Sequence, residues 1–274
     1  MKLTKNRLTE DYDASILTEL YGDAAHSPLR RTTSQIRHEL RRLMVKVPAV
    51  YLPLARWKYP PGVLHRPEAL HHDTEIVIEG YPRSGNSFAF TAFDMAQGEP
   101  SVRISHHLHT ASPVIAAIKA NIPCVILLRN PEDAIISHIL YSQNLTIKQC
   151  LNSYLDFYKP LLKYRDSFVI AKFEDVISNF GRIIQQVNQK FSTNFKVFEH
   201  TQENADKCFE VLNNSWKDLG LSEQKSVTCA PSEQRKQYKE VLRSHFRAEE
   251  LNTLRNQALD VYSAYLQPSN QEEA

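Results

Sequence analysis

Short apolar runs alternate with longer amphipathic segments from about residue 74 onward, a pattern typical of α/β proteins with a parallel sheet. The apolar runs predict strands at 74–81, 101–106, 124–130 and 167–176. The segments between and after them predict helices at 86–98, at 112–121 with Ser112 as cap, from Pro131 onward and at 176–191. The run at 124–130 is continuously apolar, as central parallel strands are. We therefore expect a three-layer domain in which helices flank a central parallel sheet.

The ends of the chain differ from this central pattern. Residues 1–72 are predicted to form a basic, partly helical extension. Residues 73–266 are predicted to form the main domain, whose C-terminal third is helical, and residues 267–274 a polar tail. Neither an internal repeat nor a low-complexity tract interrupts the sequence, so one domain with an extension is the expected organisation.

One helix of the extension is amphipathic and basic. It is predicted at 34–47, before Pro48, with an apolar side and an arginine-bearing side: Ile36, Leu40, Leu43, Met44 and Val47 against Arg37, Arg41 and Arg42. Such a helix can lie on an acidic membrane surface, which makes peripheral membrane contact one alternative. A helix docked on its own domain with a solvated charged face is the commoner case, and we predict that arrangement.

Composition narrows the possible partners. The chain has 274 residues and a net charge of +2, so bulk electrostatics gives no reason to expect a nucleic-acid partner. Its four cysteines are widely spaced without a Cys-x-x-Cys pair, which favours reduced thiols over a disulfide framework. No signal peptide and no window of roughly 18 apolar residues is present. We expect a cytoplasmic protein.

The segment "EGYPRSGNSFAF" predicts a phosphate-binding loop between the first strand and the first helix. Gly80, Gly85 and Ser87 match the consensus of glycine, four residues, glycine, lysine and serine, but Asn86 stands at the lysine position. The nearest positive charge is Arg83. A strand, a glycine loop and a helix N-terminus together offer backbone N–H groups to a phosphate or sulfate.

An ATP-dependent kinase is the first alternative that this loop suggests. Kinases of this class need the loop lysine for the β- and γ-phosphates and an aspartate after a later strand for Mg²⁺. Here Asn86 replaces the lysine, and Arg129 follows the third strand. A cation at that place attracts an anion instead of Mg²⁺. The sequence therefore predicts a ligand with two separated acidic groups and no required metal.

These segments resemble the sulfotransferases that use 3′-phosphoadenosine 5′-phosphosulfate (PAPS). "YPRSGNSF" resembles the family's 5′-phosphosulfate loop, and "RNPEDAIISH" its 3′-phosphate motif, in which Arg129 and Ser137 have the family's eight-residue spacing. "ISHHLHT" is similar to the stretch with the catalytic histidine, and "KFEDV" to a later conserved segment. The four segments come in the family's order within residues 74–180. The resemblance implies a P-loop-like fold with PAPS as sulfuryl donor.

The resemblance also implies roles for individual residues. Loop amides with Ser84, Gly85, Asn86 and Ser87 would hold the 5′-phosphate, and Arg83 would lie at the bridging oxygen. Two phenylalanines, Phe88 and Phe173, replace other aromatics near the adenine. The family's C-terminal arginine-lysine-glycine loop is absent, and Arg235 with Lys236 is the best substitute. Trp57 and Trp216 are predicted to pack within the protein, although either could stack on a sugar or on the adenine.

A histidine is expected to act as general base on the acceptor. The segment "SHHLH" offers His106, His107 and His109, and strand alternation predicts that His107 and His109 share a face while His106 points away. We choose His107 by resemblance, because it precedes Arg129 by 22 positions. A surface role and a metal site formed by the three histidines are the alternatives, and the second lacks a nearby carboxylate or cysteine.

Together these features predict a PAPS-dependent sulfotransferase that needs no metal. Its expected acceptor is a hydroxyl of a glycan or glycolipid, because an arginine in the loop is a feature of the carbohydrate-type members that it resembles. Two alternatives remain. One is a small-molecule kinase with a P-loop-type site, and the other is a non-catalytic module that binds a nucleotide or a membrane surface.

Overall fold

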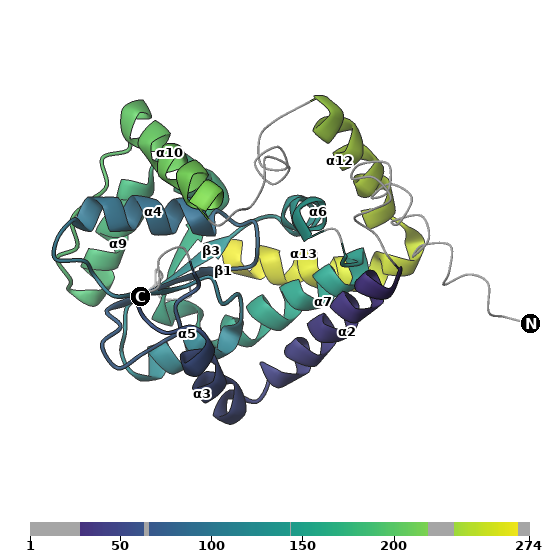
Figure 1. Cartoon of the computed structure of the whole chain (residues 1–274), viewed down its shortest axis with the longest axis horizontal. Helices are drawn as coiled ribbons and strands as arrows, with labels where there is room; N and C mark the ends of the chain where they lie inside the picture. Colours follow the sequence, from purple (N-terminus) through teal and green to yellow (C-terminus); the bar gives the residue numbers. More distant parts are fainter. Residues whose placement is uncertain (1–27, 63–65, 143, 219–232, 268–274) are drawn as a thin grey trace, which may run out of the picture.

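Four parallel strands form the central sheet of the computed structural model, which describes residues 28–62, 66–142, 144–218 and 233–267 (Figure 1). The strands are β1 (Ile76–Gly80), β2 (Ile104–His106), β3 (Cys124–Leu128) and β4 (Val169–Lys172), in the order β2-β1-β3-β4. Ile78 of β1 lies opposite His106 of β2 and Val125 of β3. The chain passes from β1 to β2 on one side and returns to β3 on the other, so the strand order reverses between β1 and β3.

Helices cover both faces of this sheet. One face packs against α4 (Asn86–Gln97), α9 (Phe180–Phe191) and α10 (Gln202–Asp218), through strand residues such as Ile78 and Val125. The other packs through residues such as Val77 and Ile126 against α5 (Ala111–Lys119), α6 (Pro131–Ser142), α7 (Ile147–Tyr158) and α13 (Asn252–Leu266). Figure 1 shows these two groups of helices on opposite sides of β1 and β3. The predicted three-layer α/β fold is confirmed.

The remaining elements connect or extend these layers. The 3₁₀ helix η2 (Lys159–Ser167) precedes β4, and the 3₁₀ helix η3 (Glu249–Leu251) precedes α13. Helix α12 (Glu233–Phe246) packs against α6. The C-terminal third is mainly helical in its described part, although residues 192–201 form an irregular segment between α9 and α10.

Several predicted boundaries were wrong. The N-cap of α5 is Thr110, not Ser112, whose hydroxyl instead donates to the carbonyl of Val45 at 2.5 Å. The predicted helix at 176–191 is two helices, α8 (Phe173–Ser178) and α9, because Asn179 caps α9 by accepting a hydrogen bond from the Arg182 amide. A further helix, α3 (Pro48–Lys58), follows the predicted amphipathic helix; it begins at Pro48 and includes Pro53.

The amphipathic helix α2 (Pro28–Met44) docks on its own domain with its polar side. Arg42 of α2 pairs with Asp156 of α7 at 2.5 Å. Lys46, which follows the end of α2, pairs with the same carboxylate at 2.9 Å. Nε2 of His38 in α2 lies 2.9 Å from the hydroxyl of Ser153 in α7. The helix docks on its own domain as expected, but the expected solvated charged face was wrong, because α7 offers polar partners to that face. On the apolar side, Ile36, Leu40, Leu43 and Val47 are exposed, whereas Met44 packs against a small core cluster that contains Tyr51.

Three further findings concern hydropathy, the cysteines and the tryptophans. Among the described residues, no helix is long and apolar enough to cross a membrane. Cys124, Cys150 and Cys208 are buried and are not part of a disulfide, whereas Cys229 lies outside the described residues. Trp57 is 79% exposed, so the prediction that it packs within the protein was wrong; the Trp216 side chain lies outside the described part.

Candidate functional site

The candidate site lies at the carboxyl ends of β1 and β3, where the strand order reverses. In open parallel sheets this reversal leaves a crevice in which ligands bind. The phosphate-loop segment follows β1 and leads into α4, and Arg129 follows β3 directly. The topology thus brings the two predicted anion-binding segments to one edge of the sheet.

The loop backbone is shaped for an anion. Arg83 and Gly85 have positive φ angles of 68° and 90°, and Gly85 is the N-cap of α4. No side chain caps α4, and its first turn contains no acidic residue. Amide N–H groups at a helix N-terminus lack partners within the helix and carry the positive end of its dipole. The start of α4 is therefore suited to a phosphate or sulfate group.

Close packing below the loop requires a glycine at position 80. A Cβ atom on Gly80 would lie 2.7 Å from both the Cβ and the carbonyl oxygen of Leu127 in β3. The Tyr158 hydroxyl donates to that carbonyl at 2.6 Å and accepts from the Tyr81 amide at 3.3 Å. Gly80 and Tyr158 together fix the loop against β3.

Two loop side chains face inward. Asn86 is 5% exposed and donates from Nδ2 to the Tyr81 carbonyl at 2.9 Å, so it braces the loop where a kinase loop would present lysine. Ser84 is completely buried. We therefore correct the expectation that these two side chains contact a phosphate. The loop can offer its backbone amides and the half-buried Ser87 instead.

Arg83 is the centre of the polar contacts around the loop. Its Nε donates to the Ser137 hydroxyl of α6 at 3.1 Å, and its guanidinium lies 5.1 Å from the ring centroid of Tyr141. Arg129 donates to the Arg83 carbonyl at 2.7 Å. The residues expected at the two acidic groups of the ligand, Arg83, Arg129 and Ser137, are thus brought together.

The two phenylalanines expected near the adenine differ in position. The Arg129 guanidinium lies over the ring of Phe173, 3.9 Å from its centroid, so Phe173 supports the arginine at the edge of the site. Phe88 is 6% exposed and packs against Phe198 and Phe209. It belongs to the core between α4 and α10, and the prediction of an adenine contact for Phe88 was wrong. For Arg235, only the backbone in α12 is described, and its side chain lies outside the described part.

The three histidines do not alternate as a strand would place them. β2 ends at His106, and His107 and His109 have positive φ angles of 60° and 52°. Nε2 of His107 lies 3.2 Å from the Ser87 hydroxyl, while Nδ1 lies 2.6 Å from Nδ1 of His106. His109 contacts the Gly80 carbonyl through Nδ1 at 2.7 Å. His106 therefore does not point away from His107, contrary to the prediction from strand alternation.

A buried carboxyl group accounts for this turn after β2. Glu79 in β1 is completely buried and accepts hydrogen bonds from the amides of Leu108 and His109, at 2.6 and 3.0 Å. The prediction of a buried strand at 74–81 did not identify Glu79 as a possible site residue. One signal was available, because an acidic residue inside an apolar strand needs partners.

Burial keeps the histidine rings neutral. It lowers the pKa of His107 to about 4 and that of His109 to about 3, with His107 adding to the second shift. Burial also raises the pKa of Glu79 to about 8, against the two amides that lower it. A neutral His107 can accept a proton at Nε2 near neutral pH, as a general base must. Among the described residues, no group of three or more histidine, cysteine, aspartate or glutamate side chains could hold a metal ion.

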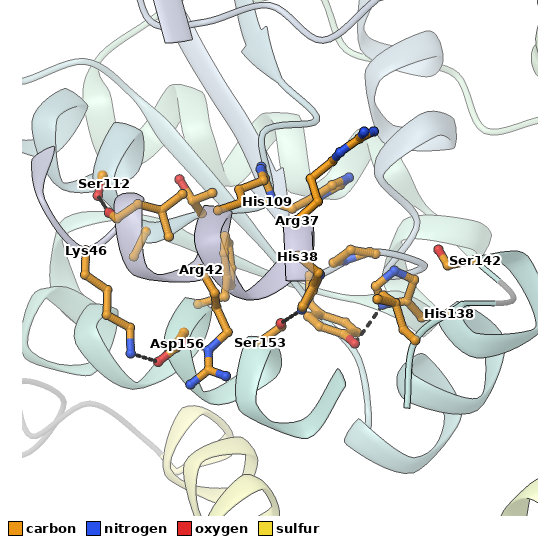
Figure 2. Close-up of a pocket in the computed structure, with 18 of the residues that line it drawn as sticks. Arg37, His38, Arg42, Lys46, His109, Ser112, His138, Ser142, Ser153 and Asp156 are labelled. Atoms are coloured by element: carbon orange, nitrogen blue, oxygen red, sulfur yellow. Dashed lines mark hydrogen bonds and ion pairs between the residues drawn. The ribbon is translucent and has the colours of Figure 1, made fainter. Parts of the chain in front are cut away.

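A cavity of about 1100 Å³ opens beside the loop, between α2 and the helices α5 to α7 (Figure 2). Tyr81, Pro82 and His109 form its wall on the side of the phosphate loop. Helix α2 contributes basic side chains to the lining, including Arg37 and Arg41, and Arg41 donates to the Leu108 carbonyl at 2.6 Å. Its volume is slightly above the range of about 300 to 1000 Å³ that is typical of sites for organic ligands. The cavity can hold a polar molecule next to the loop.

Comparisons with known proteins do not identify a family for this chain. No protein-family model matches the sequence, and no curated protein matches it. Among solved structures, the chain is similar to mouse sulfotransferase SULT7A1 complexed with PAP, with a TM-score of 0.39 and 12% sequence identity over 70% of this chain and 90% of that chain. At this similarity the function has to be argued from the residues of the site.

Proposed function

We propose that this protein is a sulfotransferase that moves a sulfuryl group from PAPS to a hydroxyl of a glycan or glycolipid. The convergence of Arg83, Arg129 and Ser137 at the uncapped start of α4 carries this proposal. It provides two guanidinium groups and a helix N-terminus within one polar cluster. A ligand with two separated acidic groups, such as the 5′-phosphosulfate and 3′-phosphate of PAPS, matches that arrangement.

The residues of the site support an in-line transfer. His107, neutral because of its burial, would accept the proton of the acceptor hydroxyl at Nε2. The acceptor oxygen then bonds to sulfur as the bond from sulfur to the bridging phosphate oxygen breaks. Arg83 and the amides at the start of α4 would stabilise the negative charge that develops on the departing phosphate. The transfer leaves the acceptor proton on His107 and releases adenosine 3′,5′-bisphosphate as the second product.

The cavity beside the loop would hold the acceptor. His109 and Pro82 lie in its wall, which places it next to the predicted site of transfer. Its lining contains hydroxyl-bearing and basic side chains such as Thr33, Ser142 and Arg37, which suit a sugar with several hydroxyl groups better than a flat phenol ring. This lining supports the glycan or glycolipid expected from the sequence.

The two other functions are distinguished by simple measurements. A kinase with this loop would need Mg²⁺ and would turn over ATP, but Asn86 is turned inward and Arg129 stands where a metal-binding aspartate would be sought. A sulfotransferase should keep its activity in the presence of a chelator. A non-catalytic module would bind the nucleotide and modify no acceptor.

The test is direct. The protein is incubated with PAPS labelled in its sulfuryl group and a panel of glycans, glycolipids and phenols, and labelled products are separated. The thermal unfolding temperature is measured in the presence of adenosine 3′,5′-bisphosphate and in the presence of ATP, and the two increases are compared. We expect a labelled glycan or glycolipid and a larger stabilisation by the bisphosphate. Equal stabilisation by both nucleotides, together with Mg²⁺-dependent ATP turnover, would favour the kinase.

A further inference from the structure

Helices α2 and α3 expose an apolar surface that the candidate site does not use. We define this outer apolar face by three residues of each helix: Ile36, Leu40 and Leu43, and Val50, Leu54 and Trp57. Leu40 and Leu43 are 62% and 61% exposed, and Trp57 is 79% exposed. Contiguous apolar surface of this kind marks an interaction site on a soluble domain.

The spacing makes this surface continuous. Within each helix the residues recur at three and four positions, so they lie along one side. Val47, in the turn between the two rows, is also exposed, and its carbonyl accepts a hydrogen bond from the Val50 amide at 3.0 Å. Figure 1 places α2 and α3 at the periphery, with α2 outside α7.

Polar contacts fix the orientation of α2, so the apolar side is not simply an undocked core face. Arg42 and Lys46 pair with Asp156, and Gln149 of α7 donates to Glu39 of α2 at 3.1 Å. Rotating α2 to bury its leucines would break these contacts and leave Asp156, now about one-fifth exposed, without its two cations. The exposed apolar face is therefore a stable feature of this arrangement.

Charge identifies the chemistry of the partner. Residues 28–58 contain eight arginine or lysine residues and one acidic residue, Glu39, although the whole chain has a net charge of only +2. Glu39 is already paired with Arg42 at 2.7 Å. Lys58 is exposed next to Trp57 in the chain. An apolar surface bordered by cations is complementary to a bilayer that contains anionic phospholipids.

We propose that the outer apolar face of α2 and α3 binds the surface of an anionic lipid bilayer. The leucines and Trp57 enter the boundary between headgroups and acyl chains, and the basic side chains contact lipid phosphates and carboxylates. A second copy of the chain is the less suitable occupant, because it would bring two strongly basic segments together. The inference stands apart from sulfuryl transfer.

Vesicle binding tests this inference with the full chain. Sedimentation is measured with vesicles of phosphatidylcholine alone and with vesicles containing about one-third phosphatidylserine. Leu40→Ser/Leu43→Ser removes two exposed leucines without touching the contacts to α7. Ile177→Ser, at a 46% exposed residue of α8, is the matched control. Thermal unfolding and binding of adenosine 3′,5′-bisphosphate report whether each variant is folded.

We expect the wild type and Ile177→Ser to bind the anionic vesicles, and to bind them more weakly as salt increases. The double variant should bind at least about tenfold more weakly while it unfolds and binds the nucleotide as the wild type does. No binding by the wild type, or equal binding by the double variant, would overturn the proposal. So would a wild-type dimer that the double substitution converts to a monomer, since a second copy would then occupy the face.

Discussion

Arg83 donates from Nε to the hydroxyl of Ser137, 3.1 Å away, and this contact joins the loop after β1 to the helix after β3. The same arginine accepts a hydrogen bond at its carbonyl oxygen from Arg129. The loop conformation and the proposed 3′-phosphate site are therefore coupled. A change at either partner should affect binding of adenosine 3′,5′-bisphosphate.

The first prediction concerns Arg129. Arg129→Ala removes the hydrogen bond to the Arg83 carbonyl and the proposed contact with the 3′-phosphate. A charge-assisted hydrogen bond contributes roughly 1.5 to 3 kcal/mol, so we expect about ten to a hundredfold weaker binding of the bisphosphate by calorimetry. Ser137→Ala should cause a smaller loss, because a neutral hydroxyl is removed. Unchanged affinity in Arg129→Ala would contradict the assignment.

The second prediction concerns Gly80. In Gly80→Ala the new Cβ would collide with the Leu127 backbone, so β1 and β3 must separate locally. We expect a loss of about 1 to 3 kcal/mol in the free energy of unfolding, measured with urea, and weaker nucleotide binding. Gly62→Ala is the control, because its nearest atom would be 3.9 Å away and only its positive φ of 71° adds strain, roughly 1 kcal/mol. Normal nucleotide binding by Gly80→Ala would show that the loop tolerates a wider strand spacing.

The loop could be predicted from the sequence because its information is local. Gly80, Gly85 and the apolar strand before them are neighbours in the chain, and together they predict a strand, a loop and a helix N-terminus. Arg129, at the end of a predicted strand, and Ser137, in the predicted helix after it, were paired by the eight-residue spacing of the motif that they resemble. Close approach at Gly80 is a consequence of the same motif.

The turn of the histidines could not be predicted from strand alternation, because a distant residue determines it. Glu79 lies 30 positions before His109, and its carboxyl group accepts a hydrogen bond from the His109 amide. This bond holds the backbone in a turn, so the strand ends at His106. The orientation of α2 has a similar cause. Its amphipathic pattern predicts two faces, but polar groups far away in the sequence, such as Asp156, 114 residues from Arg42, decide which face docks.

The third prediction uses the raised pKa of Glu79. Its folded pKa of about 8 exceeds the ordinary value of 4.5, so the folded protein retains a proton that the unfolded chain loses between these values. The contribution to stability is complete below pH 4.5 and is lost as the pH rises through about 8. The wild type should lose about 1 kcal/mol or more of unfolding free energy between pH 7 and pH 9.

Urea unfolding of two variants tests this origin. Glu79→Gln carries no titrating proton and should show a flatter profile over this range, although it is less stable at pH 7 because its amide group opposes the two backbone donors. Glu174→Gln, at an exposed residue of α8, should retain the wild-type slope. A flat wild-type profile would mean that Glu79 is ionised in the folded protein.

The last prediction separates the roles of His107 and Arg83. If Nε2 of His107 accepts the acceptor proton, His107→Ala should reduce turnover by about 10² to 10⁴-fold and leave donor binding close to normal. Arg83→Ala should reduce turnover and weaken donor binding as well, because the guanidinium contacts the donor before and during transfer.

Because burial lowers the pKa of His107 to about 4, the wild-type rate should fall as the pH drops through about 4, and not near 6.5. Steady-state rates from about pH 3 to pH 8, with donor affinity measured by calorimetry, test all three statements. Loss of turnover in His109→Ala but not in His107→Ala would move the base to the ring that borders the cavity, and full activity in both variants would refute a histidine base.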